Sequence, residues 1–81
     1  MKIVGQIKIV DHIWLPDVDC PYTVLHHTVS FAGLVEEVNK VHEKGGVLII
    51  DGIDKMADTL LWIIFTEAAN GMEVLAALGE D

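Results

Sequence analysis

Residues 30–51, SFAGLVEEVNKVHEKGGVLIID, decide the fold of this chain. Ser30 is suited to cap a helix, and the apolar residues after it recur at helical spacing on one stripe: Phe31, Leu34, Val35, Val38 and Val41. Gly45 and Gly46 then end the helix, since glycine tolerates the backbone turn found there. Val47–Ile50 is continuously apolar, which is typical of a strand covered on both faces. The stretch predicts a helix over 31–44 followed by a central strand.

Two further strands are predicted before this helix. Lys2 to Trp14 alternates between apolar and polar residues, with Ile3, Gly5, Ile7, Ile9 and Ile13 on one parity, which indicates a half-buried strand. Leu15 to Pro21 contains two prolines and two aspartates and predicts a loop. Tyr22 to Val29 is rich in β-branched and aromatic residues, so we expect a second strand there, antiparallel to the first.

After the central strand, Asp58 or Thr59 is expected to cap a second helix that runs to Asn70. Projected at 100° per residue, its inward face consists of Leu61, Ile64, Phe65 and Ala68. Met72 to Leu78 fits a strand or a continued helix, and the helix stop at Asn70-Gly71 favours the strand. The prediction is therefore one α/β domain over 1–81, with element order β-β-α-β-α-β and helices packed on a small mixed sheet.

Charge and composition exclude several classes of protein. The 81 residues carry a net charge of −8 and include no arginine, so we expect no direct binding to nucleic acid and no attraction to an anionic membrane. Leu60 to Phe65 is the longest apolar run, far short of the ~20 residues of a membrane-spanning helix. The first residues do not resemble a signal peptide, and a single cysteine, Cys20, suits a reducing compartment. The expected location is the cytoplasm.

The residues capable of catalysis or metal binding do not form a familiar pattern. Asp51, Asp54 and Asp58 follow the central strand and could meet at its carboxyl end, although carboxylates there usually serve as caps and turn residues. Adjacent His26 and His27 are expected to point to opposite faces of a strand, so at most one of them could join a site with Cys20 and His12. The sequence therefore predicts no enzyme activity, no catalytic residues, no metal and no cofactor.

The second helix offers the best candidate for a binding surface. Its outward side consists of Thr59, Thr66 and Asn70, with Glu67 beside them. Ile63 falls among these polar residues and Trp62 lies at their edge. The residues expected to bind a partner are Asp58, Thr59, Trp62, Ile63, Thr66 and Glu67. One interpretation is a helix that is buried more deeply than usual. The other is an exposed apolar patch, which marks an interface with a partner, especially where it contains tryptophan.

From His27 onward, the order of these elements resembles a STAS domain, the fold of bacterial anti-sigma-factor antagonists. The residues that carry the resemblance are the helix over 31–44, the strand Val47–Asp51, the helix start Asp58-Thr59-Leu60 and the segment Asn70–Leu75. In that family an Asp-Ser/Thr pair at the start of this helix carries a regulatory phosphorylation site. The resemblance implies that Thr59 is the phosphorylated position and that Asp58 is its neighbour.

Two functional hypotheses follow. The first is a small acidic regulatory module that binds a protein partner with a basic or apolar surface, such as a kinase-type anti-sigma factor if the STAS resemblance holds. The alternative is an inhibitor from a phage or mobile element that binds a host or defence protein by acidic mimicry of nucleic acid. Residues 51–81 carry seven acidic residues and one lysine, a net charge of −6, which suits such mimicry. A homodimer formed through an edge strand or the second helix is a further expectation.

Overall fold

The computed structural model of the chain describes residues 6–15 and 19–79. Its elements, in chain order, are β1 (Gln6–Val10), β2 (Tyr22–His26), α1 (Phe31–Lys44), β3 (Val47–Asp51), the short 3-10 helix η2 (Ile53–Lys55), α2 (Asp58–Ala69) and β4 (Glu73–Ala77). The α/β class and the order β-β-α-β-α-β are confirmed, and the segment after Gly71 is a strand, as favoured. The predicted positions 2–5 of the first strand lie outside the described residues.

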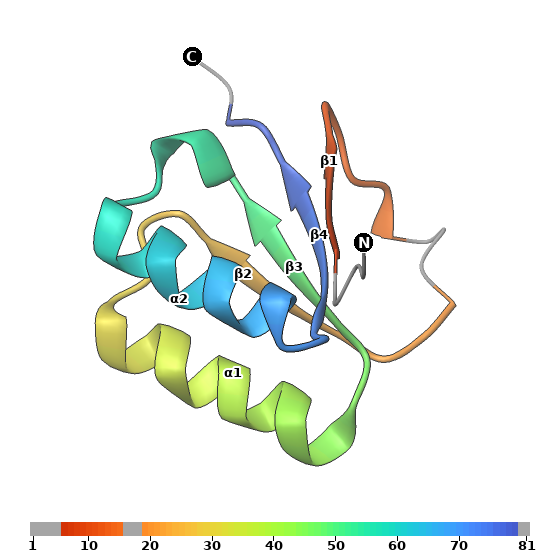
Figure 1. Cartoon of the computed structure of the whole chain (residues 1–81). Helices are drawn as coiled ribbons and strands as arrows, with labels where there is room; N and C mark the ends of the chain where they lie inside the picture. The colour runs from red at the N-terminus through yellow and green to blue at the C-terminus, as the bar shows by residue number, and fades with distance from the viewer. Residues whose placement is uncertain (1–5, 16–18, 80–81) are drawn as a thin grey trace.

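The four described strands form one sheet in the order β1-β4-β3-β2, and each neighbouring pair is parallel. The units β2-α1-β3 and β3-α2-β4 are successive right-handed crossovers, so both helices lie on one face of the sheet (Figure 1). We call the opposite side the helix-free face. In register, Leu48 lies beside Val74 on the helical face and Ile49 lies beside Leu75 on the helix-free face.

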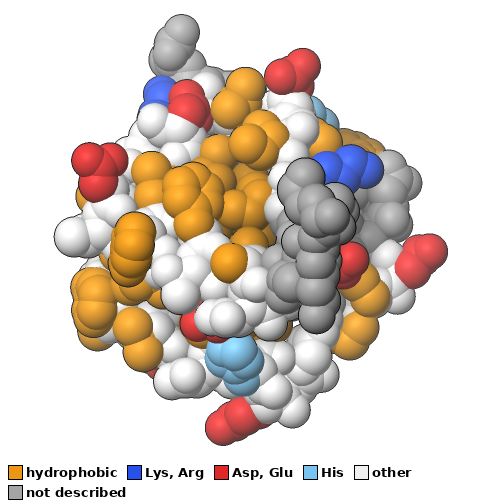
Figure 2. Space-filling view, viewed as in Figure 1, with side chains coloured by type: hydrophobic (Ala, Val, Ile, Leu, Met, Phe, Trp, Pro, Cys, Tyr) orange, Lys and Arg blue, Asp and Glu red, His pale blue; other side chains and the backbone are white. Residues whose placement is uncertain are grey.

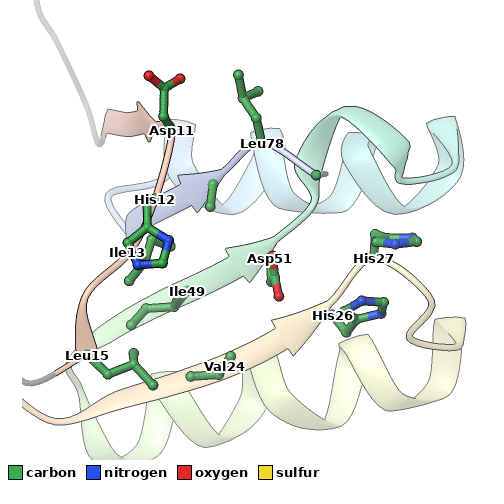
Figure 3. A pocket seen from close by; sticks show the side chains of 12 residues that line it. Asp11, His12, Ile13, Leu15, Val24, His26, His27, Ile49, Asp51 and Leu78 are labelled. Atoms are coloured by element: carbon green, nitrogen blue, oxygen red, sulfur yellow. The ribbon is translucent and has the colours of Figure 1, made fainter. Parts of the chain in front are cut away.

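The prediction that the first two strands pair antiparallel in a mixed sheet is wrong. β1 lies at the opposite edge from β2 and runs parallel to β4. After β1 the segment Asp11–Leu15 lies over the helix-free face, and the chain enters β2 at the far edge (Figure 3). Asp11–Leu15 and the two helices therefore lie on opposite faces of the sheet.

The hydrophobic core lies between the sheet and the two helices. Its helical side comes from Leu34, Val38 and Val41 of α1 and from Leu60, Ile64 and Ala68 of α2. Its sheet side is built mainly by alternate residues of the two central strands: Leu48, Ile50, Val74 and Ala76. Ile49 is buried on the other face, so β3 is covered on both faces, as its apolar run predicts. Among the described helices, none has the length and apolar character needed to cross a bilayer.

α2 begins and faces differently from the prediction. Its N-cap is Ala57, which makes no side-chain capping bond, so neither Asp58 nor Thr59 caps the helix. The buried side is Leu60, Ile64 and Ala68, with Leu61 and Ile63 half-buried beside it, whereas Phe65 is 50% exposed. The sequence of α2 is apolar around most of its circumference, so a rotation of the helix by about one residue leaves its pattern nearly unchanged.

Ser30 caps α1, as predicted: its hydroxyl oxygen accepts a hydrogen bond from the Gly33 N–H at 3.1 Å. Ser30→Ala leaves this N–H without its partner and is expected to lower the free energy of unfolding by about 1 kcal/mol. Urea titration followed by circular dichroism measures the loss. Ser30→Asp restores an acceptor at the same position and is expected to recover most of it. Equal losses in the two variants would show that the cap contributes nothing.

Candidate functional site

A hydrogen bond between the two helices shows which of their sides face each other. His42 Nε2 on α1 lies 2.8 Å from Glu67 Oε1 on α2. Val35 and Phe31 precede His42 by about two and three helical turns, so they lie on the same side of α1 and face α2. Ile63 precedes Glu67 by one turn and therefore faces α1. The seam between the helices is apolar at the α1 N-terminal end and polar at the other.

Trp62 lies at the outermost part of α2. Its side chain is 74% exposed, and its backbone carbonyl accepts a hydrogen bond from the Thr66 hydroxyl at 2.8 Å. Phe65 and Leu61 lie on the side of α2 away from α1, toward β1, where Ile9 is 57% exposed. Figure 2 shows hydrophobic side chains in two groups on this face, one beside the start of α1 and a larger one between α2 and β1.

We define the helical apolar surface as the exposed hydrophobic side chains of this face, which are Ile9, Phe31, Val35, Trp62 and Phe65. Single exposed apolar residues are ordinary on protein surfaces. Five large ones on one face, drawn from three elements, are typical of an interaction site. The surface includes both phenylalanines and one of the two tryptophans of the chain.

The residues predicted for partner binding divide into two groups. Asp58, Thr59, Trp62 and Thr66 are exposed on α2, next to or within the helical apolar surface. Ile63 and Glu67 are half-buried on the side that faces α1, and Ile63 packs against the core. The prediction that Ile63 is exposed is therefore wrong, whereas the exposure of Trp62 is confirmed.

Four members of the surface were missed because the sequence pattern places them inside. Phe31 and Val35 belong to the apolar stripe of α1, and Phe65 to the projected inward face of α2. Ile9 has the parity of the buried side of its strand but lies at an edge of the sheet. The feature of the sequence that could have identified Phe31 and Val35 as exposed is the width of the apolar stripe of α1. A helix on one side of a sheet buries a narrower band, here Leu34, Val38 and Val41.

A second candidate site is a pocket of about 480 Å³ on the helix-free face. It lies between the segment Asp11–Leu15 and the carboxyl ends of the inner strands, where ligands of parallel sheets usually bind (Figure 3). The polar side chains that line it are His12, His26, His27, Asp11 and Asp51, above an apolar floor of Val24 and Ile49. The lining includes no lysine or arginine to hold an anionic group.

The two adjacent histidines correct another prediction. His26 and His27 line the same pocket, and their ring centroids are 4.1 Å apart, although strand alternation would separate them. β2 ends at His26, so His27 already belongs to the turn that follows. His26 Nδ1 lies 2.8 Å from the Thr28 hydroxyl, which ties the ring to this turn.

The acidic residues after β3 do not converge. Asp51 lines the pocket, Asp54 accepts a hydrogen bond from the Gly79 N–H at 2.6 Å, and Asp58 opens α2. In residues 6–15 and 19–79, no group of three or more His, Cys, Asp and Glu side chains is arranged to hold a metal ion. Cys20 is a free, exposed thiol.

Comparisons of the chain with protein-family models, with curated proteins and with solved structures found no match. The two candidate sites differ in kind. The helical apolar surface is a set of exposed apolar side chains, like those at the centres of protein interfaces, whereas the pocket on the helix-free face has mainly polar side chains on its walls.

Proposed function

We propose that this chain is a regulatory module that binds a protein partner through the helical apolar surface. The observation that carries the proposal is the exposure of Trp62, with Phe31, Val35, Phe65 and Ile9 on the same face. Keeping these side chains in water is unfavourable, and a partner that covers them gains about 25 cal/mol for each Å² of apolar area buried. Tryptophan is one of the residues most enriched among binding hot spots.

The charge of the chain favours a partner with basic residues around an apolar centre. Asp58, Glu36 and Glu43 are exposed on the two helices, and the chain as a whole carries a charge of −8. A partner with lysine or arginine around its apolar contact would be attracted over several ångströms before docking. A partner with an acidic rim would be repelled. This complementarity supports specificity, while the apolar contact supplies most of the affinity.

Phosphorylation of Thr59, which the STAS resemblance implies, stays a prediction for this chain. The Thr59 side chain is exposed in the first turn of α2, one helical turn before Trp62. A phosphate there would suit the positive end of the helix dipole and add charge beside the proposed contact. The modification would thus change partner binding without disturbing the fold.

Trp62→Ala is expected to weaken binding to the partner by more than about thirty-fold, which corresponds to ~2 kcal/mol. The matched control is Trp14→Ala, because Trp14 is also exposed but belongs to the connection on the helix-free side of the sheet. We expect this control to bind within about two-fold of the unchanged chain, since it lies outside the contact. The partner is first captured from lysate with the tagged chain, then purified and titrated by isothermal calorimetry.

Salt separates this proposal from acidic mimicry of nucleic acid. An apolar contact keeps most of its affinity at about 0.5 M salt, where screening shortens electrostatic interactions to a few ångströms. A mimic would lose its partner under that condition and would tolerate Trp62→Ala. A partner that binds the Trp62→Ala and Trp14→Ala variants equally well would overturn the proposal.

A further inference from the structure

β2 is an edge strand whose free side is built for pairing with another strand. The Val47 N–H donates to the Pro21 carbonyl and the His27 N–H donates to the Asp51 carbonyl, at 3.0 and 2.9 Å. The odd-numbered residues of β2 therefore direct their backbone groups toward β3. By strand alternation, the N–H and C=O groups of Tyr22, Val24 and His26 point outward, and no described strand pairs with them.

These outward groups are self-complementary about a two-fold axis at Val24. In an antiparallel pair of two β2 strands, Val24 lies opposite Val24 of the second copy, and Tyr22 lies opposite its His26. Each of these pairs exchanges two backbone hydrogen bonds, because all three residues point to the free side. The side chains of Tyr22 and Val24 are exposed on the helix-free face, where such pairing would bring them together.

The β2 edge carries few charges that would repel a second copy of the chain, whereas the acidic residues elsewhere would. The stretch from Cys20 to Val35 contains no Asp, Glu, Lys or Arg, in a chain whose net charge is −8. The side of α1 that faces away from α2, above this edge, carries charges of both signs, with Lys40 Nζ bonded to Glu37 Oε1 at 3.0 Å. Two copies that met at α2 would instead bring their acidic C-terminal halves together.

The other edge of the sheet lacks these properties. β1 carries Lys8 at its centre, and two copies joined there would place lysines near each other. A lysine on an edge strand is a common means of preventing strand pairing. β2 has no charged residue and no proline between Tyr22 and His26. Of the two edges, only β2 is without such protection.

From these observations we propose that the chain forms a homodimer in which two β2 strands pair antiparallel about Val24 and join two four-stranded sheets into one. The occupant of the β2 edge is thus a second copy of this chain. The dimer leaves the helical apolar surface of each copy accessible, so it goes beyond the proposed partner binding and is independent of it.

Sedimentation equilibrium of the whole purified chain, over micromolar to submillimolar concentrations, tests the proposal. We expect a concentration-dependent rise to the mass of two chains. Val24→Lys places two ammonium groups beside the axis and is expected to weaken dimerisation at least ten-fold. Ile9→Lys is the matched control at the β1 edge, since Ile9 is similarly exposed, at 57% against 46% for Val24, and it is expected to leave the dimer intact. Circular dichroism verifies that both variants are folded.

A cross-link tests the register. In a Cys20→Ser background, Val24→Cys places two thiols on facing residues whose Cα atoms are about 5.5 Å apart, within disulfide range. Mild oxidation is expected to convert most of this variant to a covalent dimer and to leave the Ile9→Cys variant, in the same background, as single chains. A chain that is monomeric at all concentrations would overturn the proposal. So would a dimer that cross-links through Ile9→Cys, or one that Val24→Lys does not weaken.

Discussion

Ile64→Ala is expected to lower the free energy of unfolding by about 3 kcal/mol, because it opens a cavity in the centre of the core. Ile64 is fully buried on α2 and belongs to the core cluster that also contains residues of α1 and of the two central strands. Its neighbour Phe65 is the larger side chain but is half-exposed, so Phe65→Ala is expected to cost about 1 kcal/mol or less. Denaturant titration of the two variants measures both losses.

This pair also tests the orientation of α2. A helical projection of the sequence places Ile64 and Phe65 side by side on the inward face. Both alanine substitutions would then be strongly destabilising. In the structure only Ile64 is inside, so the two losses are expected to differ by at least two-fold. Equal losses, or a larger loss for Phe65→Ala, would show that the helix is rotated and would remove Phe65 from the helical apolar surface.

Gly46→Ala is expected to lower the free energy of unfolding by about 3–5 kcal/mol, which combines backbone strain with a steric overlap. Gly46 has φ of 101°, in the region that side chains with a Cβ disfavour. A Cβ atom there would overlap the carbonyl oxygen of Pro21, which is the acceptor for the Val47 N–H. The substitution therefore disrupts the hydrogen bond that joins Pro21, the residue just before β2, to the first residue of β3.

Gly71→Ala is the matched control for this substitution. Gly71 has φ of 107°, nearly the same as Gly46, but a Cβ atom there meets no other atom within 4 Å. It is expected to cost only the backbone strain, about 1–2 kcal/mol. The difference between the two variants, measured by thermal or denaturant unfolding, isolates the contact with Pro21. Similar losses at both positions would mean that the loop before β3 adjusts freely.

The segments with a strong local pattern were predictable from the sequence. The helix over 31–44 has an apolar stripe, a capping serine and a glycine stop, and the structure places it at those bounds. The run after Gly46 is continuously apolar and is the most deeply buried strand. The strand that pairs with β1 was not predictable. Alternation of apolar and polar residues indicates which face of a strand is buried, but it does not indicate which strand lies beside it.

The candidate site was predictable only in part, for a related reason. Trp62 was found because it lies at the edge of the polar residues on the outer side of α2. Phe31 and Phe65 were assigned to the core, since an apolar residue at the margin of a stripe is ambiguous until the neighbouring elements are placed. The pocket depends on the crossing of Asp11–Leu15 over the sheet, a long-range arrangement with no local pattern.

The parallel pairing of β1 with β4 has a consequence for the order in which the chain folds. β2, α1, β3, α2 and β4 follow one another in space as in sequence, so each can dock on the element made just before it. β1 is different, because Ile7 pairs with Val74, near the other end of the chain. Closing so long a loop is slow, and during synthesis β1 has no partner until β4 has been made. β1 is therefore expected to dock last, on a sheet that is already assembled.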